Sequence, residues 1–174
     1  MYEINGVVRI ERGRLPGGDA GTRVTLEMMR RLVHEGSSQF AVRWTALRIV
    51  RGAGVASHDT LGMLRALYRF VRDEITFVND TLGVQVIQSP RVTLTARAGN
   101  CVQRAVLLAA LAAAVGIPTS FKAIGADPRR PTEFSHVYLV AHLGRQVIAM
   151  DPTYGDNALG WQHPRPSRRM EVKV

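Results

Sequence analysis

The chain of 174 residues contains a single cysteine, Cys101. One thiol cannot form an intramolecular disulfide, and the absence of a Cys-x-x-Cys motif or a Cys/His cluster argues against structural zinc. No motif indicates an organic cofactor. We therefore expect a protein without disulfide, metal or cofactor, whose one thiol is either an inert core residue or a nucleophile.

Long hydrophobic runs are also missing. The longest, AVLLAALAAAVGI at residues 105–117, is too short to span a bilayer. The N-terminus, MYEINGVVRIERGRLPGG, is charged early and lacks the apolar core of a signal peptide. These absences predict a soluble, cytoplasmic protein with no membrane partner.

Lysine is rare, because 21 of the 23 basic residues are arginine, and the formal net charge is +9. The planar arginine fork binds phosphate well, so this excess raises the question of a nucleic-acid partner. The arginines are scattered, however, and no basic run is interleaved with aromatic residues. We expect no dedicated nucleic-acid site, although the basic surface permits such binding.

The composition, 46% hydrophobic and 21% charged, is typical of one soluble globular domain. Glycine and proline are frequent in residues 1–21, which predicts an extended arm or a short hairpin. Residues 161–174 are rich in proline and arginine and predict a basic C-terminal tail on the surface or hanging free. The domain itself is expected over residues 22–160.

The spacing of apolar residues predicts four helices, over residues 22–36, 38–52, 57–75 and 101–116. In the second helix, Phe40, Trp44, Leu47 and Val50 form one apolar stripe that we assign to the core.

Residues 76–100 lack a helical period and predict a loop with short strand pieces. Three strand-like segments follow the last helix, at residues 119–124, 135–142 and 146–151. Helices followed by an antiparallel sheet predict an α+β domain.

Cys101 stands where a polar loop changes into an alanine- and leucine-rich helix. Asn100 is a good N-cap, so the thiol is expected in the first helical turn, where the helix dipole favours the thiolate. Gly99 would let the chain turn sharply and leave the backbone accessible to a substrate. The alternative is a buried, inert cysteine, since free cysteine is among the most buried residue types.

A nucleophilic cysteine needs a base, and the base needs an acceptor that orients it. Residues 135–151 predict a β-hairpin with a two-residue turn at Leu143–Gly144, and this register places His136 directly opposite Asp151. Cross-strand neighbours lie about 5 Å apart, which suits a carboxylate that accepts from an imidazole. The alternative is that His136 caps a strand edge and Asp151 starts an Asp-Pro turn.

Three ordered pieces, AGNCVQRAVLLAALAAAVGIP, FSHVYLVAHL and VIAMDPTYG, resemble the transglutaminase-like branch of the papain-like cysteine hydrolases and transferases. The family pattern is a Gly-x-Cys at a helix start, a His on a following strand and an Asp-Pro at the end of the next strand. The resemblance extends roughly from Asp59 to Trp161. It implies a papain-like α+β fold, with N-terminal helices and a central helix packed on an antiparallel sheet.

The resemblance implies a catalytic triad in which Cys101 is the nucleophile, His136 the general base and then acid, and Asp151 the residue that orients His136. Many bacterial and phage relatives carry acidic residues beside the cysteine, where this chain has Asn100, Val102 and Gln103. That departure leaves the triad intact but puts a shared substrate preference in doubt. Three side chains are candidates for the second oxyanion donor: Gln85, Gln88 and Asn100.

The expected reaction is attack of the thiolate on an amide or carboxamide carbonyl, which gives a thioester. Small bacterial and phage members of the family are more often hydrolases than crosslinkers, so we expect a peptidase or amidase that acts on a protein or peptide. The alternative is a non-enzymatic papain-like binding or structural module. In a phage it would be a virion or assembly component that contacts neighbouring subunits through its arm and tail, in the host cytoplasm or the virion.

Overall fold

The computed structural model describes residues 2–4, 7–9, 13–80 and 85–174 of the chain. The predicted arm and the predicted 76–100 loop therefore fall partly outside the described residues, at positions 1, 5–6, 10–12 and 81–84. Near the N-terminus, β1 (Tyr2–Ile4) pairs antiparallel with β2 (Val7–Arg9), as in a short hairpin.

The helices of the described residues are α1 (Gly18–Ser37), α2 (Phe40–Gly52), α3 (Thr60–Glu74), α4 (Pro90–Ala96) and α5 (Cys101–Ala114). The first begins at Gly18 rather than at Thr22, since Gly17 serves as its N-cap. Asp59 caps α3 by accepting from the Gly62 N–H at 2.8 Å. None of these helices combines the length and apolar character that a membrane span requires.

The expectation of a loop with strand pieces over residues 76–100 was incomplete. Residues Thr76–Phe77 (β3) and Ala98–Gly99 (β4) do form a short parallel pair, but α4 lies between them. The start of α4 has a local signal, because the Ser89 hydroxyl accepts from the Val92 N–H and proline occupies the first helical position. A helix of seven residues is too short for its periodicity to stand out.

The main sheet has four strands in the order β7-β6-β5-β8, and each pair is antiparallel. The strands are β5 (Thr119–Ile124), β6 (His136–Leu143), β7 (Gln146–Met150) and β8 (Arg169–Lys173). Of the two alternatives for the C-terminal tail, on the surface or hanging free, residues 169–173 follow the first, because they form the edge strand β8 beside β5. The alternation of exposed and half-buried side chains in RMEVK is the pattern of such an edge strand.

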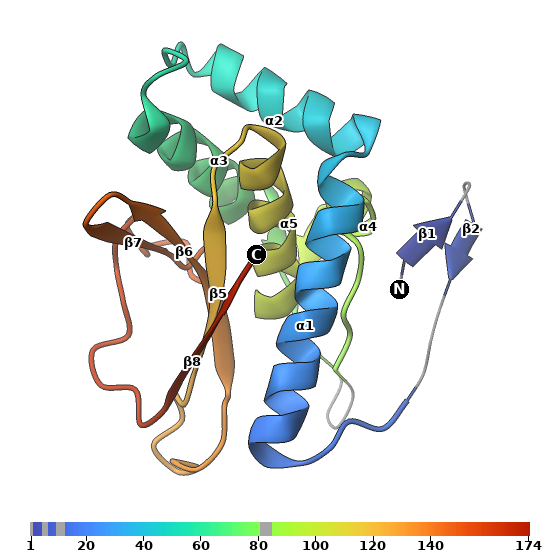
Figure 1. Ribbon diagram of the computed structural model, residues 1–174, viewed down its shortest axis with the longest axis vertical. Coiled ribbons are helices and arrows are strands. Elements are labelled where there is room, and N and C mark those ends of the chain that lie inside the picture. The colour runs from blue at the N-terminus through green and yellow to red at the C-terminus, as the bar shows by residue number, and fades with distance from the viewer. Residues whose placement is uncertain (1, 5–6, 10–12, 81–84) are drawn as a thin grey trace.

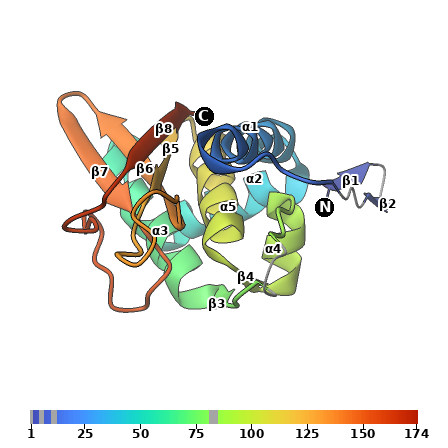
Figure 2. The same cartoon turned by 90° about the horizontal axis from the view of Figure 1, so that it is seen from below.

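Helix α5 lies between the sheet and α1 (Figure 1), and the view from below shows β5, β6 and α3 on one side of it and α1 and α4 on the other (Figure 2). Residues Val102 to Ala112 of α5 are all buried. A helix that is apolar on all sides suits a central position, and its many alanines let neighbouring elements pack closely. The N-terminal end of α5 is thereby held at a fixed place beside the start of β6.

The assignment of the α2 apolar stripe to the core was wrong for three of its four residues. Phe40 is 81% exposed and Trp44 54% exposed, and Leu47 is also exposed, whereas Val50 is buried. The helix buries its smaller residues instead: Val42, Thr45, Ala46 and Val50. Small side chains let α2 lie close to α3 and α5, and the aromatic residues of the same helix then face outward.

Candidate active site

Cys101 is the first residue of α5, as the sequence predicted, and its side chain is half-buried. A capping box holds this helix end: the Asn100 side chain accepts from the Gln103 N–H at 2.9 Å, and the Gln103 side chain accepts from the Asn100 N–H at 3.1 Å. In the described part of the chain, the box leaves the N–H groups of Cys101 and Val102 without a backbone or side-chain acceptor. These two donors point out of the helix end, beside the thiol.

The sharp turn before Cys101 is made by Arg97 rather than by Gly99. Arg97 has a φ of 54°, in the left-handed region, and Gly99 does not have a positive φ. Glycine is needed at position 99 for close packing instead, since a Cβ there would lie 2.9 Å from Cβ of Gln103. Gly99 thus makes room for the capping-box glutamine.

His136 begins β6, and Asp151 directly follows β7. The Nε2 atom of His136 lies 2.8 Å from Oδ2 of Asp151, so the expected imidazole–carboxylate pair is present. Both side chains are well shielded, with 13% of His136 and 2% of Asp151 exposed.

The predicted register of this hairpin was wrong by two residues. Leu143 pairs with Gln146, so the turn is at Gly144–Arg145, where Gly144 has a φ of 60°, and not at Leu143–Gly144. His136 is therefore a diagonal rather than a direct neighbour of Asp151. The contact survives because side chains on a strand alternate with a period of two, so a shift of two residues keeps both on the same face.

The charge state of His136 follows from its surroundings. Burial acts to lower the pKa of His136, but the hydrogen bond with Asp151 and the interaction with the Cys101 side chain outweigh it and raise the pKa to about 10. Burial acts in the opposite sense on Asp151, yet the His136 imidazole and the Thr153 backbone hold its pKa below the usual value. At neutral pH the pair is an imidazolium and a carboxylate, next to the thiol.

Three hydrogen bonds fix the turn that carries Asp151. Its Oδ1 atom accepts from the Thr153 N–H at 3.1 Å, and its backbone carbonyl accepts from the Tyr68 hydroxyl at 3.0 Å and from the Asn157 amide at 3.2 Å. Burial raises the pKa of Tyr68 to about 12, so this phenol remains a neutral donor. Tyr68 and Asn157 were not among the residues that the sequence singled out.

Arg104 is a further residue that the sequence did not single out. It lies one turn after Cys101, is 2% exposed, and donates to the backbone carbonyls of Thr153, Val71 and Arg72 at 3.1, 2.9 and 2.8 Å. Burial lowers the pKa of this guanidinium, and the nearby Asp151 carboxylate opposes that shift. Arg104 thus ties the first turns of α5 to the Asp151 turn and to the end of α3.

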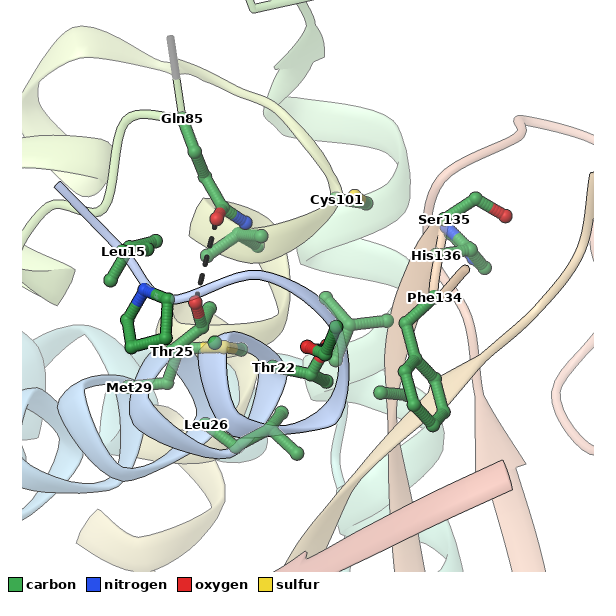
Figure 3. A pocket seen from close by; sticks show the side chains of 16 residues that line it. Leu15, Thr22, Thr25, Leu26, Met29, Gln85, Cys101, Phe134, Ser135 and His136 are labelled. Atoms are coloured by element: carbon green, nitrogen blue, oxygen red, sulfur yellow. Dashed lines mark hydrogen bonds between the residues drawn. The ribbon is translucent and has the colours of Figure 1, made fainter. Parts of the chain in front are cut away.

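A cavity of about 260 Å³ opens beside Cys101 and His136, bounded by α1, the segment before it and the start of β6. Figure 3 shows Leu26, Met29 and Phe134 on its walls together with Thr25 and Gln85. No Asp, Glu, Lys or Arg of the described residues lines it. Apart from the His136 imidazolium, the lining of the space next to the thiol suits an uncharged and largely apolar group.

The structure separates the three candidates for a second oxyanion donor. The Gln88 amide is buried and donates to the Thr93 hydroxyl at 3.0 Å, and the Asn100 side chain serves the capping box. Gln85 lines the cavity, and its Oε1 accepts from the Thr25 hydroxyl at 3.5 Å (Figure 3). This contact leaves the Gln85 NH₂ group as the end of the side chain that can donate.

Residues 48–152 match the model of the transglutaminase-like superfamily. The chain belongs to this superfamily. The match includes Cys101, His136 and Asp151, whereas α1 and β8 lie outside it. The transglutaminase-like domain of this chain thus has an N-terminal helix that forms one wall of the cavity.

Two solved structures are similar to this chain, and the first of them, with the higher TM-score, shares its fold. One is a candidate protease from Parabacteroides distasonis, with 12% sequence identity and a TM-score of 0.57 over 74% of this chain and 26% of that one. The other is a candidate cysteine protease from Cytophaga hutchinsonii, with 24% identity and a TM-score of 0.48 over 65% of this chain and 37% of that one. The chain spans well under half the length of either protein. No curated protein matches the sequence.

Proposed function

We propose that this transglutaminase-like protein is a cysteine-dependent acyl-transfer enzyme that acts on amide or carboxamide bonds through a thioester. The observation that carries the proposal is the His136–Asp151 hydrogen bond of 2.8 Å, on an imidazole that also interacts with Cys101 at a helix start. The Nε2 atom of the imidazole is hydrogen-bonded to Asp151, so Nδ1 is the nitrogen that exchanges a proton with the thiol. Nucleophile, base and orienting acceptor then have the connectivity that covalent catalysis requires.

In the first half-reaction, the Cys101 thiolate attacks the carbonyl carbon and a C–S bond forms. The negative charge that develops on the carbonyl oxygen is met by the free N–H of Cys101 and the NH₂ group of Gln85. The tetrahedral intermediate collapses when the C–N bond breaks and Nδ1 of His136 gives its proton to the leaving amine. A thioester and a neutral imidazole remain.

In the second half-reaction, His136 takes a proton from the incoming nucleophile, which attacks the thioester. The C–S bond breaks and the thiolate–imidazolium pair is restored. Water as the nucleophile gives a carboxylic acid, and a lysine amine gives an isopeptide crosslink. We propose hydrolysis, so that the protein is a peptidase or amidase of peptide or protein substrates.

The cavity supports an expectation about the substrate. Its volume of about 260 Å³ and its lining without charged side chains of the Asp, Glu, Lys or Arg type, within the described residues, suit a residue with an apolar side chain of medium size. The many arginines of the surface do not contribute to this cavity. The group beside the scissile bond is therefore expected to be uncharged.

The second candidate function is a non-enzymatic papain-like module that binds neighbouring subunits, for example in a virion. The observation that favours it is the exposed aromatic pair of α2, in which the Phe40 and Trp44 rings stack at a centroid distance of 6.2 Å. An ordered thiol, imidazole and carboxylate serve no purpose in such a module. We therefore place the enzymatic function first.

The test incubates a mixture of peptides and a dansylated amine with either the wild type or the Cys101→Ala variant. Mass spectrometry then identifies the products. We expect new peptide termini or glutamine deamidation with the wild type, reduced by at least about 1,000-fold in the variant. Amine incorporation without acid release would show that the enzyme catalyses crosslinking and not hydrolysis. Identical products from both proteins would reject the enzymatic function.

A further inference from the structure

A second groove, separate from the cavity beside Cys101, lies between α3, β7 and the segment 158–160. Its volume is about 460 Å³. Three arginines of α3 line it: Arg65, Arg69 and Arg72. Its apolar floor includes side chains from three elements: Leu61, Ile148 and Leu159. A basic row beside an apolar floor is a surface for a ligand that is both anionic and partly apolar.

The positive charge of this groove is only partly compensated. Arg72 pairs with Asp73 at 2.6 Å and donates to the Asn157 carbonyl at 3.2 Å. Arg65 and Arg69 are exposed, and neither forms an ion pair with another described residue, although Asp73 interacts with Arg69 at longer range. Like charges four residues apart on a helix repel each other, so the row is less stable without a bound anion than with one.

The other side of the groove is the outer edge of β7, which Gly160 covers at Ala149 and which is open at Val147. β7 is an edge strand, and the carbonyl of Ala149 accepts from the Gly160 N–H on its outer side at 2.8 Å. Backbone groups of alternate residues point the same way, so the N–H and C=O of Val147 also point outward. No described strand pairs with this edge. An open edge of this kind is a template for an added strand.

We propose that this groove binds an extended acidic peptide segment, which pairs with the outer edge of β7 and directs its carboxylates at Arg65 and Arg69. Side chains on one face of a strand repeat every two residues, about 6.7 Å, and residues four apart on a helix rise about 6 Å. A segment with acidic side chains at every second position therefore matches the spacing of the arginines. Main-chain pairing supplies affinity, and the arginine row supplies selectivity for acidic sequences.

The groove adjoins the turn that carries Asp151. Tyr68 and Arg72 line it, and both also hold the 151–157 segment through the Asp151 and Asn157 carbonyls. A bound acidic segment is thus a second point of attachment close to the candidate active site. The binding itself does not depend on the proposed reaction, so it is measured without turnover.

The experiment measures binding of a fluorescein-labelled peptide of about 12 residues, with glutamate at alternate positions, by fluorescence anisotropy on the Cys101→Ser variant. We expect Arg65→Glu/Arg69→Glu in that background to weaken binding at least about tenfold, and Arg65→Gln/Arg69→Gln to weaken it several-fold. The matched control is Arg48→Glu/Arg51→Glu on α2, which makes the same change of net charge outside the groove and is expected to stay within about twofold. Circular dichroism checks that every variant is folded.

Two further peptides complete the experiment. Replacement of every glutamate by lysine should abolish binding, and methylation of alternate backbone nitrogens should weaken it at least about tenfold, because it removes the main-chain donors. Equal losses in the two charge-reversal variants, or binding of the lysine peptide as tight as that of the acidic one, would overturn the acidic specificity. Undiminished binding of the methylated peptide would overturn the strand pairing.

Discussion

Strand β6 carries two histidine–carboxylate pairs whose lengths are nearly the same. His136 lies 2.8 Å from Asp151, and His142, on the same face of the strand, lies 2.9 Å from Glu171. The first pair is 13% and 2% exposed, whereas the second is 43% and 40% exposed. A hydrogen-bond length alone therefore does not distinguish the candidate catalytic pair from a surface pair.

What separates the two pairs is the number of groups that surround them. Asp151 sits in a turn that Tyr68, Asn157 and Thr153 hold, and His136 also interacts with the Cys101 side chain. His142 has Ser120 at 3.4 Å as its second neighbour, and its pair faces the solvent. Water screens the exposed pair, whereas the protein surroundings strengthen the buried one.

The largest expected difference concerns the reactivity of Cys101. We compare the rate of alkylation by iodoacetamide at about pH 6 in the wild type and in the variants His136→Ala and His142→Ala. The first variant loses the proton acceptor of the thiol, so labelling should slow by about 100-fold or more, while the second should stay within about twofold. If both variants react like the wild type, the His136 imidazole does not activate Cys101.

The next difference concerns the free energy of unfolding as a function of pH. Because the pKa of His136 is raised, its contribution to the free energy of unfolding is complete below about pH 6.5 and is lost as the pH rises toward 10. The lowered pKa of Asp151 means that its contribution is present above about pH 3.8 and is lost as the pH falls. Urea denaturation should therefore show a stabilisation of a few kcal/mol between about pH 4 and 6.5 that decreases on both sides.

The two pairs supply the controls for this pH dependence. Asp151→Asn should remove most of the pH dependence of the free energy of unfolding. Glu171→Gln should leave that dependence unchanged, because an exposed pair contributes about 1 kcal/mol of stability at most. The same profile in Asp151→Asn as in the wild type would mean that the buried pair does not control the stability.

The smallest expected effect is that of a single hydroxyl. Tyr68→Phe removes the donor to the carbonyls of Asp151 and Asn157, and should lower the free energy of unfolding by about 1–2 kcal/mol. Tyr138→Phe is the matched control, since Tyr138 is also buried but its hydroxyl has no hydrogen-bond partner among the described residues, and it should change stability by less than about 0.5 kcal/mol. Thermal unfolding that ranks the two variants in the reverse order would show that the Asp151 turn is not held by Tyr68.

The errors of the sequence interpretation have definite physical causes. The hairpin turn was misplaced by one residue, which shifts the pairing by two, and the His136–Asp151 contact was still found because the two-residue period keeps the same face. The α2 stripe was assigned to the core although its aromatic residues are exposed, because a helix with apolar residues on two faces does not reveal which face it buries. Tyr68 and Arg104 were missed because they donate to backbone carbonyls of distant segments, which no local pattern indicates. Asn157 was missed although its acceptor, the Asp151 carbonyl, is only six residues away.

The sequence by itself determined the local chemistry of this protein. Asn100 and Gln103 start a helix at Cys101 through hydrogen bonds between residues three apart, and the alternation of β6 puts His136 and His142 on one face. Only the tertiary structure decided which of the two histidines is buried beside the thiol and which lies in solvent. Burial and the local dielectric depend on segments far apart in the chain, and these meet only when the helices pack against the sheet.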